Sequence, residues 1–138
     1  MDTPNWAQQL IKDNIDYLNS KGYTISFPDI NWRKPTARRY NFSTDTETKI
    51  RRKCSSGICY KDHITICAGS DRKDCKLVIL HEIAHWARPD GEHHSQSFWK
   101  LAWELYRRNK LPIRYCLNRE KDYRKGAIKA YKGLNKGG

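Results

Sequence analysis

Two histidines and one glutamate stand at a spacing that suits metal-dependent hydrolysis. The segment His81-Glu82-Ile83-Ala84-His85 has the pattern HExxH. In a helix, residues four positions apart differ by about 40° of rotation, so both imidazoles project from one face and can bind the same ion. Glu82 lies one position along, where its carboxylate can take a proton from a metal-activated water molecule. The pattern therefore predicts a zinc site that activates water.

A catalytic zinc ion usually has three protein ligands and keeps its fourth position for water, so a third ligand is needed. The longer pattern HExxHxxGxxH is absent, because Arg88 and Gly91 stand at its glycine and final histidine positions. Three other residues downstream are candidates: His93, His94 and Glu104.

Helical phase favours His94 among these candidates. When His94 is set to zero at 100° per residue, Leu101 and Leu105 lie near −20° and +20°, whereas Glu104 lies near −80°. His94 is therefore in line with the apolar stripe that should pack on the HExxH helix, and Glu104 lies at the border of that stripe. If they are not metal ligands, Glu104 is an ordinary solvated residue of its helix and His93 is a loop residue.

The charge of the chain is strongly positive and concentrated in two stretches. The 138 residues include 27 Lys plus Arg and 15 Asp plus Glu, which gives a net charge of +12 and a pI near 9.6. Residues 107–138 hold 11 of the basic residues against two acidic ones, and residues 33–53 hold eight against two. Such stretches are either solvated faces or binding surfaces for a polyanion such as nucleic acid.

The start of the chain has no basic and apolar leader, and no window approaches the roughly 18 apolar residues that a membrane span needs. The five cysteines are odd in number and include no CxxC pair, which favours reduced thiols. We therefore expect an intracellular protein, cytoplasmic or nucleoid-associated (nuclear in a eukaryote), that is not secreted and has no membrane partner. The default interpretation of the cysteines is that they are small buried hydrophobic residues, with the alternative that Cys54 and Cys59, which flank a plausible hairpin turn at residues 55–57, could face each other across two strands.

The pattern of apolar and turn residues predicts an α+β fold, with a small, mainly antiparallel sheet packed on helices. The length suits one domain, with a core at about 4–108 and a basic extension at about 109–138 that forms one loosely packed helix or a mobile tail. Trp32, Trp86, Trp99 and Trp103 are expected to lie in the core rather than to stack on bases. Helices are predicted at 4–20, 70–88 and 95–108, and strands at 23–32, 37–42, 49–54, 58–60 and 64–68.

The segment from His81 to Arg108, preceded by the strand-like residues 64–68, resembles the SprT-like zinc metallopeptidases, the family of the Spartan protease domain. In that family HExxH is followed by a short insertion and then by His, a small residue, two variable residues and an aromatic. Here that block is His94-Ser95-Gln96-Ser97-Phe98, which makes His94 the third ligand. The resemblance is specific over residues 75–106, and no CxxC zinc ribbon follows it.

The resemblance implies a zincin-like core and a zinc endopeptidase that acts on DNA-bound or DNA-crosslinked proteins, with one Zn²⁺ held by His81, His85 and His94 and with Glu82 as general base. DNA contact is then expected through residues 33–53 and 107–138, and loss of residues 117–138 is expected to leave zinc in place.

Three points stay open at this stage. The alternative is a nucleic-acid-binding protein whose zinc is structural, with His93 or Cys75 as a fourth ligand. Hydrolysis of a bond other than the peptide bond is a weaker hypothesis. The sequence does not decide whether Tyr60, His63 or Tyr115 donates the hydrogen bond that stabilises the oxyanion formed during hydrolysis.

Overall fold

The computed structural model describes residues 2–34, 36–51, 53–88, 94–120 and 124–136. This part of the chain contains five helices and five strands, which confirms the α+β class. In chain order the elements are α1 (Asn5–Ser20), β1 (Asp29–Arg33), β2 (Thr36–Asn41), β3 (Thr46–Arg51), β4 (Ser56–Cys59), β5 (His63–Cys67), α2 (Arg72–Ala87), α3 (Gln96–Arg108), α4 (Ile113–Arg119) and α5 (Arg124–Lys136).

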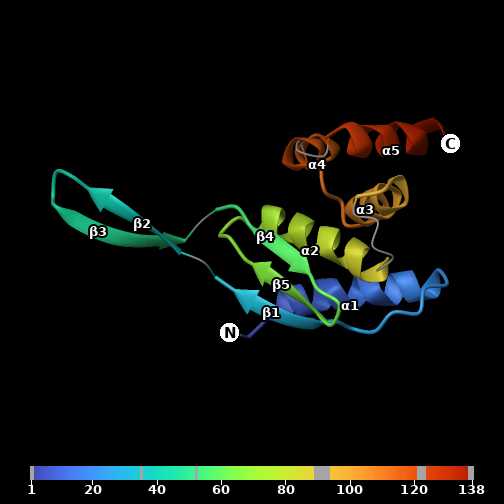
Figure 1. Cartoon of the computed structure of the whole chain (residues 1–138), viewed down its shortest axis with the longest axis horizontal. Helices are drawn as coiled ribbons and strands as arrows, with labels where there is room; N and C mark the ends of the chain where they lie inside the picture. Colours follow the sequence, from blue (N-terminus) through green and yellow to red (C-terminus); the bar gives the residue numbers. More distant parts are fainter. Residues whose placement is uncertain (1, 35, 52, 89–93, 121–123, 137–138) are drawn as a thin grey trace.

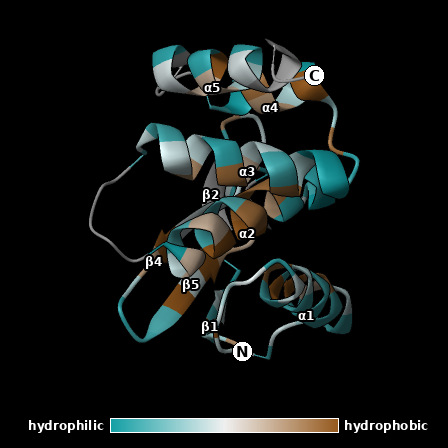
Figure 2. Cartoon of the chain, turned by 90° about the vertical axis from the view of Figure 1, so that its right-hand side faces the viewer, coloured by the Kyte–Doolittle hydropathy of each residue, from teal (hydrophilic) through white to brown (hydrophobic). Residues whose placement is uncertain are grey.

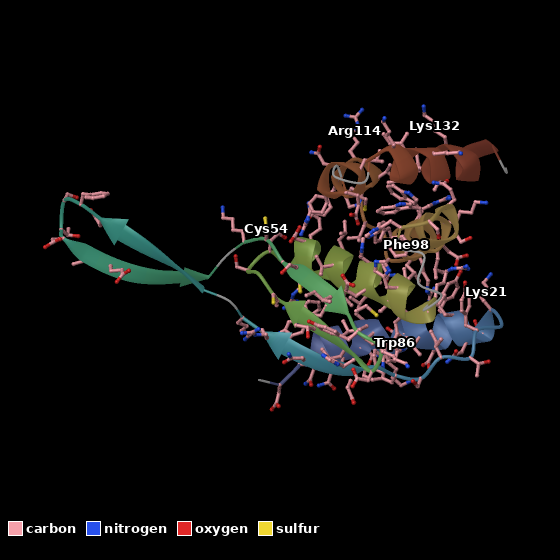
Figure 3. The ribbon with its side chains drawn as sticks, viewed as in Figure 1. Lys21, Cys54, Trp86, Phe98, Arg114 and Lys132 are labelled. Carbon is pink, nitrogen blue, oxygen red and sulfur yellow. The ribbon has the colours of Figure 1, made fainter. Side chains whose placement is uncertain are left out.

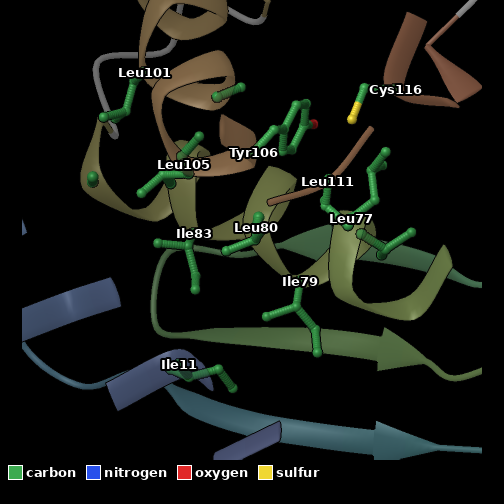
Figure 4. Close-up of a cluster of buried hydrophobic side chains, with 14 of the residues drawn as sticks. Ile11, Leu77, Ile79, Leu80, Ile83, Leu101, Leu105, Tyr106, Leu111 and Cys116 are labelled. Atoms are coloured by element: carbon green, nitrogen blue, oxygen red, sulfur yellow. The ribbon is translucent and has the colours of Figure 1, made fainter. Parts of the chain in front are cut away.

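Helix α2 lies at the centre of the molecule. It packs on β4 and β5, on α1 and on α3 (Figure 1). Four consecutive residues, 77–80, are buried, so the helix is covered on nearly all sides rather than along one stripe. Leu77, Leu80 and Ile83 belong to one cluster with residues of α1, α3 and α4 (Figure 4). The Asp71 carboxylate caps the start of α2 by accepting from the backbone N–H groups of Lys73 and Asp74.

The three-stranded sheet is mixed, with the order β1-β5-β4. The central strand β5 is parallel to β1, where Ile30 pairs with Ile64, and antiparallel to β4, where Gly57 pairs with Ile66. The expectation of a mainly antiparallel sheet is therefore wrong for this sheet. A short turn joins β4 to β5, so these two strands must be antiparallel. Strand β1 is separated from its partner β5 by a long segment, so the two can run parallel.

Residues 23–27 do not form the predicted strand. The side-chain amide of Asn19 bonds both backbone groups of Ile25, accepting from its N–H at 2.9 Å and donating to its carbonyl at 3.0 Å. The indole N–H of Trp86 donates to the Ser26 carbonyl at 2.9 Å. Side chains of α1 and α2 thus satisfy this backbone in place of a neighbouring strand.

Strands β2 and β3 pair with each other and form a hairpin that projects from the body of the molecule (Figure 1). They correspond to the predicted strands at 37–42 and 49–54. The predicted hairpin turn at residues 55–57 is wrong, because Ser56–Cys59 is one strand that pairs with β5. Cys54 and Cys59 therefore do not face each other across two strands, and all five cysteines are free thiols.

The C-terminal segment forms two helices that cover α3 on the side away from the sheet (Figure 2). Trp103 donates its indole N–H to the Ala127 carbonyl at 2.9 Å, and Ala127 and Ala130 are buried. A Cβ atom on Gly126 would lie 3.1 Å from the Trp99 ring nitrogen, so small residues permit this close approach. The prediction of one loosely packed helix or a mobile tail is therefore wrong.

Asp74 of α2 fixes α4 against the core. Its buried carboxylate accepts from the Tyr115 hydroxyl at 2.9 Å, from Arg119 Nε at 2.6 Å and from the backbone N–H of Ser55. The Arg119 guanidinium also donates to the Ser55 carbonyl. One carboxylate thereby connects α2, α4 and the residues that lead into β4.

Trp32, Trp99 and Trp103 are each at most 2% exposed, which confirms their assignment to the core, and Trp86 is half-buried. Within the described ranges, no helix has the length and apolar character that crossing a membrane requires.

We predict that Asp74→Asn lowers the free energy of unfolding by about 2 kcal/mol or more, because the amide places an NH₂ donor against partners that are themselves donors. Urea denaturation measures the effect. The matched control is Asp16→Asn, which breaks an exposed, solvent-screened pair with Lys12 at 2.7 Å and should lower the free energy of unfolding far less than Asp74→Asn does. Equal effects of the two variants would show that the Asp74 contacts add nothing beyond a surface pair.

Candidate metal centre

The structure brings His81, His85 and His94 together. Their ligand atoms all lie within 4.8 Å of one another, and Nε2 of His81 is 3.2 Å from Nε2 of His94. Two imidazole nitrogens bound to one tetrahedral zinc ion at about 2.0 to 2.1 Å stand about 3.3 Å apart. Three neutral imidazoles are also a donor set typical of catalytic zinc. The residues present therefore fit a zinc ion.

Aromatic side chains of α3 hold two of the three imidazoles in place. The ring of His85 stacks on Phe98 at 4.2 Å between centroids, and the ring of His94 stacks on Trp99 at 5.5 Å. Figure 3 marks Phe98 at the interface of α2 and α3. Because Phe98 and Trp99 are buried, these contacts restrict how far His85 and His94 can turn.

His94 reaches the cluster from outside α3. It precedes Ser95, whose hydroxyl caps the helix by accepting from the N–H of Phe98, and its φ of 55° lies in the left-handed region. A non-glycine residue in this region is uncommon and costs free energy. The helical phase that favoured His94 in the sequence therefore does not apply, because His94 lies outside the helix. His94 is nevertheless the candidate that lies in the cluster.

Glu82 lies beside the histidines in a largely dry environment. It is 6% exposed, and this burial raises its pKa to about 7, with His81 opposing the shift and Glu120 adding to it. Strand β4 covers the side chain: a Cβ atom on Gly57 would lie 2.8 Å from Cγ of Glu82. Burial, with a smaller effect of the Glu82 charge, raises the pKa of the Cys59 thiol to about 11. Cys59 is therefore neutral near pH 7.

Glu120, at the C-terminal end of α4, contacts the far side of His81. Its Oε1 lies 2.9 Å from Nδ1 of His81 and accepts from the Tyr106 hydroxyl at 2.7 Å. Burial by itself would raise the pKa of Glu120, but its hydrogen bond to His81, the His81 charge, the Tyr106 hydroxyl and Arg119 together hold that pKa below its usual value. A proton on Nδ1 that donates to this carboxylate leaves Nε2 of His81 free to bind a metal ion.

Sequence reasoning did not identify Glu120 or Tyr106. A signal was present, since Glu120 is one of two acidic residues in a segment with 11 basic ones. An acidic residue in such a basic segment needs a local reason, and here the reason is the partly buried imidazole of His81.

The other candidates lie elsewhere. Glu104 is exposed on α3 and lines a surface pocket of about 670 Å³ together with basic residues of α3 and Arg88. Cys75 is buried but is not part of the histidine cluster, and His93 lies outside the described residues. Tyr115 donates to Asp74, and Tyr60 stacks on His63 at 4.5 Å.

Comparisons of the chain with protein-family models, with curated proteins and with solved structures found no match.

We predict that Glu120→Ala weakens zinc binding by about 10- to 100-fold, because His81 loses the carboxylate that fixes its ring and its proton. Glu120→Gln should fall between this variant and the wild type, since its amide oxygen still accepts a hydrogen bond but carries no charge. Competition with a coloured chelator measures the affinity, with Glu104→Gln as the control.

The same contact revises the expectation for truncation. A chain that ends at residue 116 lacks both Arg119 and Glu120, so we now expect it to bind zinc more weakly than the full chain. Unchanged zinc affinity in both the truncated chain and Glu120→Ala would contradict the role given to Glu120.

We predict that Gly57→Ala slows any hydrolysis in which Glu82 takes part at pH 7, while the affinity for zinc stays unchanged. The added methyl group would meet Cγ of Glu82 at 2.8 Å and Cγ1 of Val78 at 3.0 Å, so Glu82 must move. Zinc content and cleavage rate are measured on the same preparation. Gly133→Ala is the control, because no atom lies within 4 Å of the added Cβ; full activity of Gly57→Ala would show that the position of Glu82 is not critical.

Proposed function

We propose that this protein is a zinc-dependent endopeptidase of the SprT-like kind. The observation that carries the proposal is the group of three imidazoles, with ligand atoms within 4.8 Å of one another, next to a buried glutamate that follows the first histidine on the same helix. This combination suits hydrolysis, because the ligands hold the ion and the carboxylate handles the proton. The likeness of residues 75–106 to that family adds to the proposal.

Each residue then has a defined role. His81, His85 and His94 hold the ion, which supplies Lewis-acid activation of water and of the scissile carbonyl. Glu82 takes the proton of the attacking water and delivers it to the leaving amine. Its burial supports this role, since a pKa of about 7 lets the carboxyl group accept and release a proton near neutral pH. Glu120 and Tyr106 orient His81.

Strand β4 offers a place for the substrate. It lies at the edge of the sheet order β1-β5-β4, and its Gly57 and Cys59 face Glu82. The side chain between them, Ile58, is 54% exposed. An extended peptide that adds to this edge by main-chain hydrogen bonds would pass beside the Glu82 carboxylate. This geometry favours a peptide or an unfolded protein segment as substrate.

The competing function is a nucleic-acid-binding protein with a structural zinc ion. A structural site normally has four protein ligands, and for this site Cys75 and His93 are the nearest spare candidates in the sequence. Among the residues that the structure describes, the cluster holds three ligands, and Cys75 is not one of them. The described residues thus give no support to Cys75 as a fourth ligand, and His93 lies outside them.

The positive charge of residues 33–53 and 107–138 supports an association with DNA, so that the substrates would be DNA-bound or DNA-crosslinked proteins. The free thiols fit an intracellular location, cytoplasmic or nucleoid-associated, or nuclear in a eukaryote.

The test is degradation of casein, a loosely folded protein, by the wild type and by Glu82→Gln, with zinc content measured on both. We expect about one zinc ion per chain in each protein, and a cleavage rate at least about 100-fold lower for the variant, since general base catalysis contributes on this order. The control is Glu104→Gln, which removes an exposed carboxylate from α3. Equal cleavage by wild type and Glu82→Gln, or a wild type without stoichiometric zinc, would overturn the proposal.

A further inference from the structure

Of the three histidines in the candidate metal centre, only His94 lies outside a helix. His81 and His85 belong to α2, whose backbone hydrogen bonds fix their positions along the helix. His94 precedes Ser95, the N-cap of α3, and its φ of 55° is in the left-handed region, which is unfavourable for a residue with a Cβ atom. Contacts with the rest of the chain must therefore hold this imidazole beside the other two.

The indole ring of Trp99 supports the imidazole of His94. The two rings stack, with 5.5 Å between their centroids and an angle of 26° between their planes. Phe98 meets the same imidazole edge-on, with 5.0 Å between centroids. Trp99 is 1% exposed, so its ring cannot shift without displacing the side chains around it. The position of the indole therefore limits the positions that His94 can take.

Gly126 of α5 lies against the edge of the same indole. Helix α5 packs on α3 here (Figure 2), and a Cβ atom on Gly126 would be 3.1 Å from Nε1 and 3.3 Å from Cδ1 of Trp99. Glycine is less favourable than alanine within a helix, so a glycine at this position needs a reason. The close approach of the indole supplies that reason.

Two hydrogen bonds fix α5 on α3. The side-chain amide of Gln96, the first residue of α3, donates to the Gly126 carbonyl at 3.1 Å. The indole N–H of Trp103 donates to the carbonyl of the next residue, Ala127, at 2.9 Å. These bonds hold the Gly126 segment of α5 next to the start of α3, directly after His94.

We propose that α5 positions the third metal ligand, with Gly126 fixing the place of Trp99 and Trp99 fixing that of His94. Neither Gly126 nor Trp99 belongs to the histidine cluster, so both act as positioning residues. The inference rests on the zinc site of the proposed function but not on hydrolysis. It assigns α5 a role distinct from that of α4, which contacts His81 through Glu120.

Matched substitutions on α5 test the inference. Leucine replaces Gly126 in one variant and Gly133 in the other, where no atom lies within 4 Å of an added Cβ. Leucine favours a helix more than glycine does at both positions, so the helix itself is not weakened. Zinc affinity of the full chain is measured by competition with a coloured chelator.

We expect Gly126→Leu to bind zinc about tenfold more weakly than the wild type, because the displaced indole moves His94 away from the other two ligands. Gly133→Leu should differ from the wild type by less than about twofold. Equal affinities of the two variants would overturn the proposal.

Gly126→Ala covers the case in which Gly126→Leu does not fold. Its methyl group requires the indole to move by a few tenths of an ångström, so we expect a loss of zinc affinity of about threefold. An affinity equal to that of Gly133→Ala would count against the proposal in the same way.

A cycle with His94→Ala shows whether the effect passes through His94. Without this imidazole there is no third ligand to position, so Gly126→Leu should change the zinc affinity of His94→Ala by less than about twofold. Trp99→Phe, which keeps a ring beside His94, should retain more zinc affinity than Trp99→Leu. An equal loss from Gly126→Leu with and without His94 would show that α5 acts on the whole site and would overturn the proposal.

The outcomes separate this inference from the proposed function. A wild type that binds no zinc would overturn both. Zinc binding by the wild type that no substitution at position 126 affects would overturn the positioning role of α5 alone.

Discussion

The hydrogen bond between His81 and Glu120 is the contact on which the arrangement of this protein depends. It can form only when the segment after α3 folds back, because Glu120 is 39 residues away from His81 in the chain. The Asp74 carboxylate holds Arg119 and Tyr115 of the same helix, so two buried carboxylates connect α4 to α2. A basic segment that resembles an appendage in the sequence thereby supplies a contact to the candidate metal centre.

Helix α2 carries Asp74, His81 and Glu82, whose side chains contact parts of the chain outside this helix. Asp74 is bonded by α4 and by the residues before β4, His81 by α4 and α3, and Glu82 is covered by β4. Buried polar groups are costly without partners, so these contacts specify how the sheet and the C-terminal helices sit around α2. The contacts around the candidate metal centre are therefore also contacts that hold the fold together.

The sequence predicted what depends on local patterns. The HExxH pair and the ends of the helices predicted at 4–20, 70–88 and 95–108 depend on neighbouring residues, and the structure has helices within one or two residues of those bounds. The pairing of β1 with β5 and the contact of Glu120 with His81 join residues that are far apart in the chain, and no sequence spacing predicts them. His94 was selected with a helical phase that its φ of 55° does not obey, although it does lie in the histidine cluster, so its role as a third ligand stays a prediction.

The central claim is a zinc ion held by three imidazoles with one position left for water. X-ray absorption at the zinc edge of the zinc-loaded full chain measures this directly. The account predicts three imidazole nitrogens and one oxygen at about 2.0 to 2.1 Å, and loss of one nitrogen in His94→Ala. A sulfur ligand at about 2.3 Å, or four imidazoles, would contradict it and would favour a closed structural site.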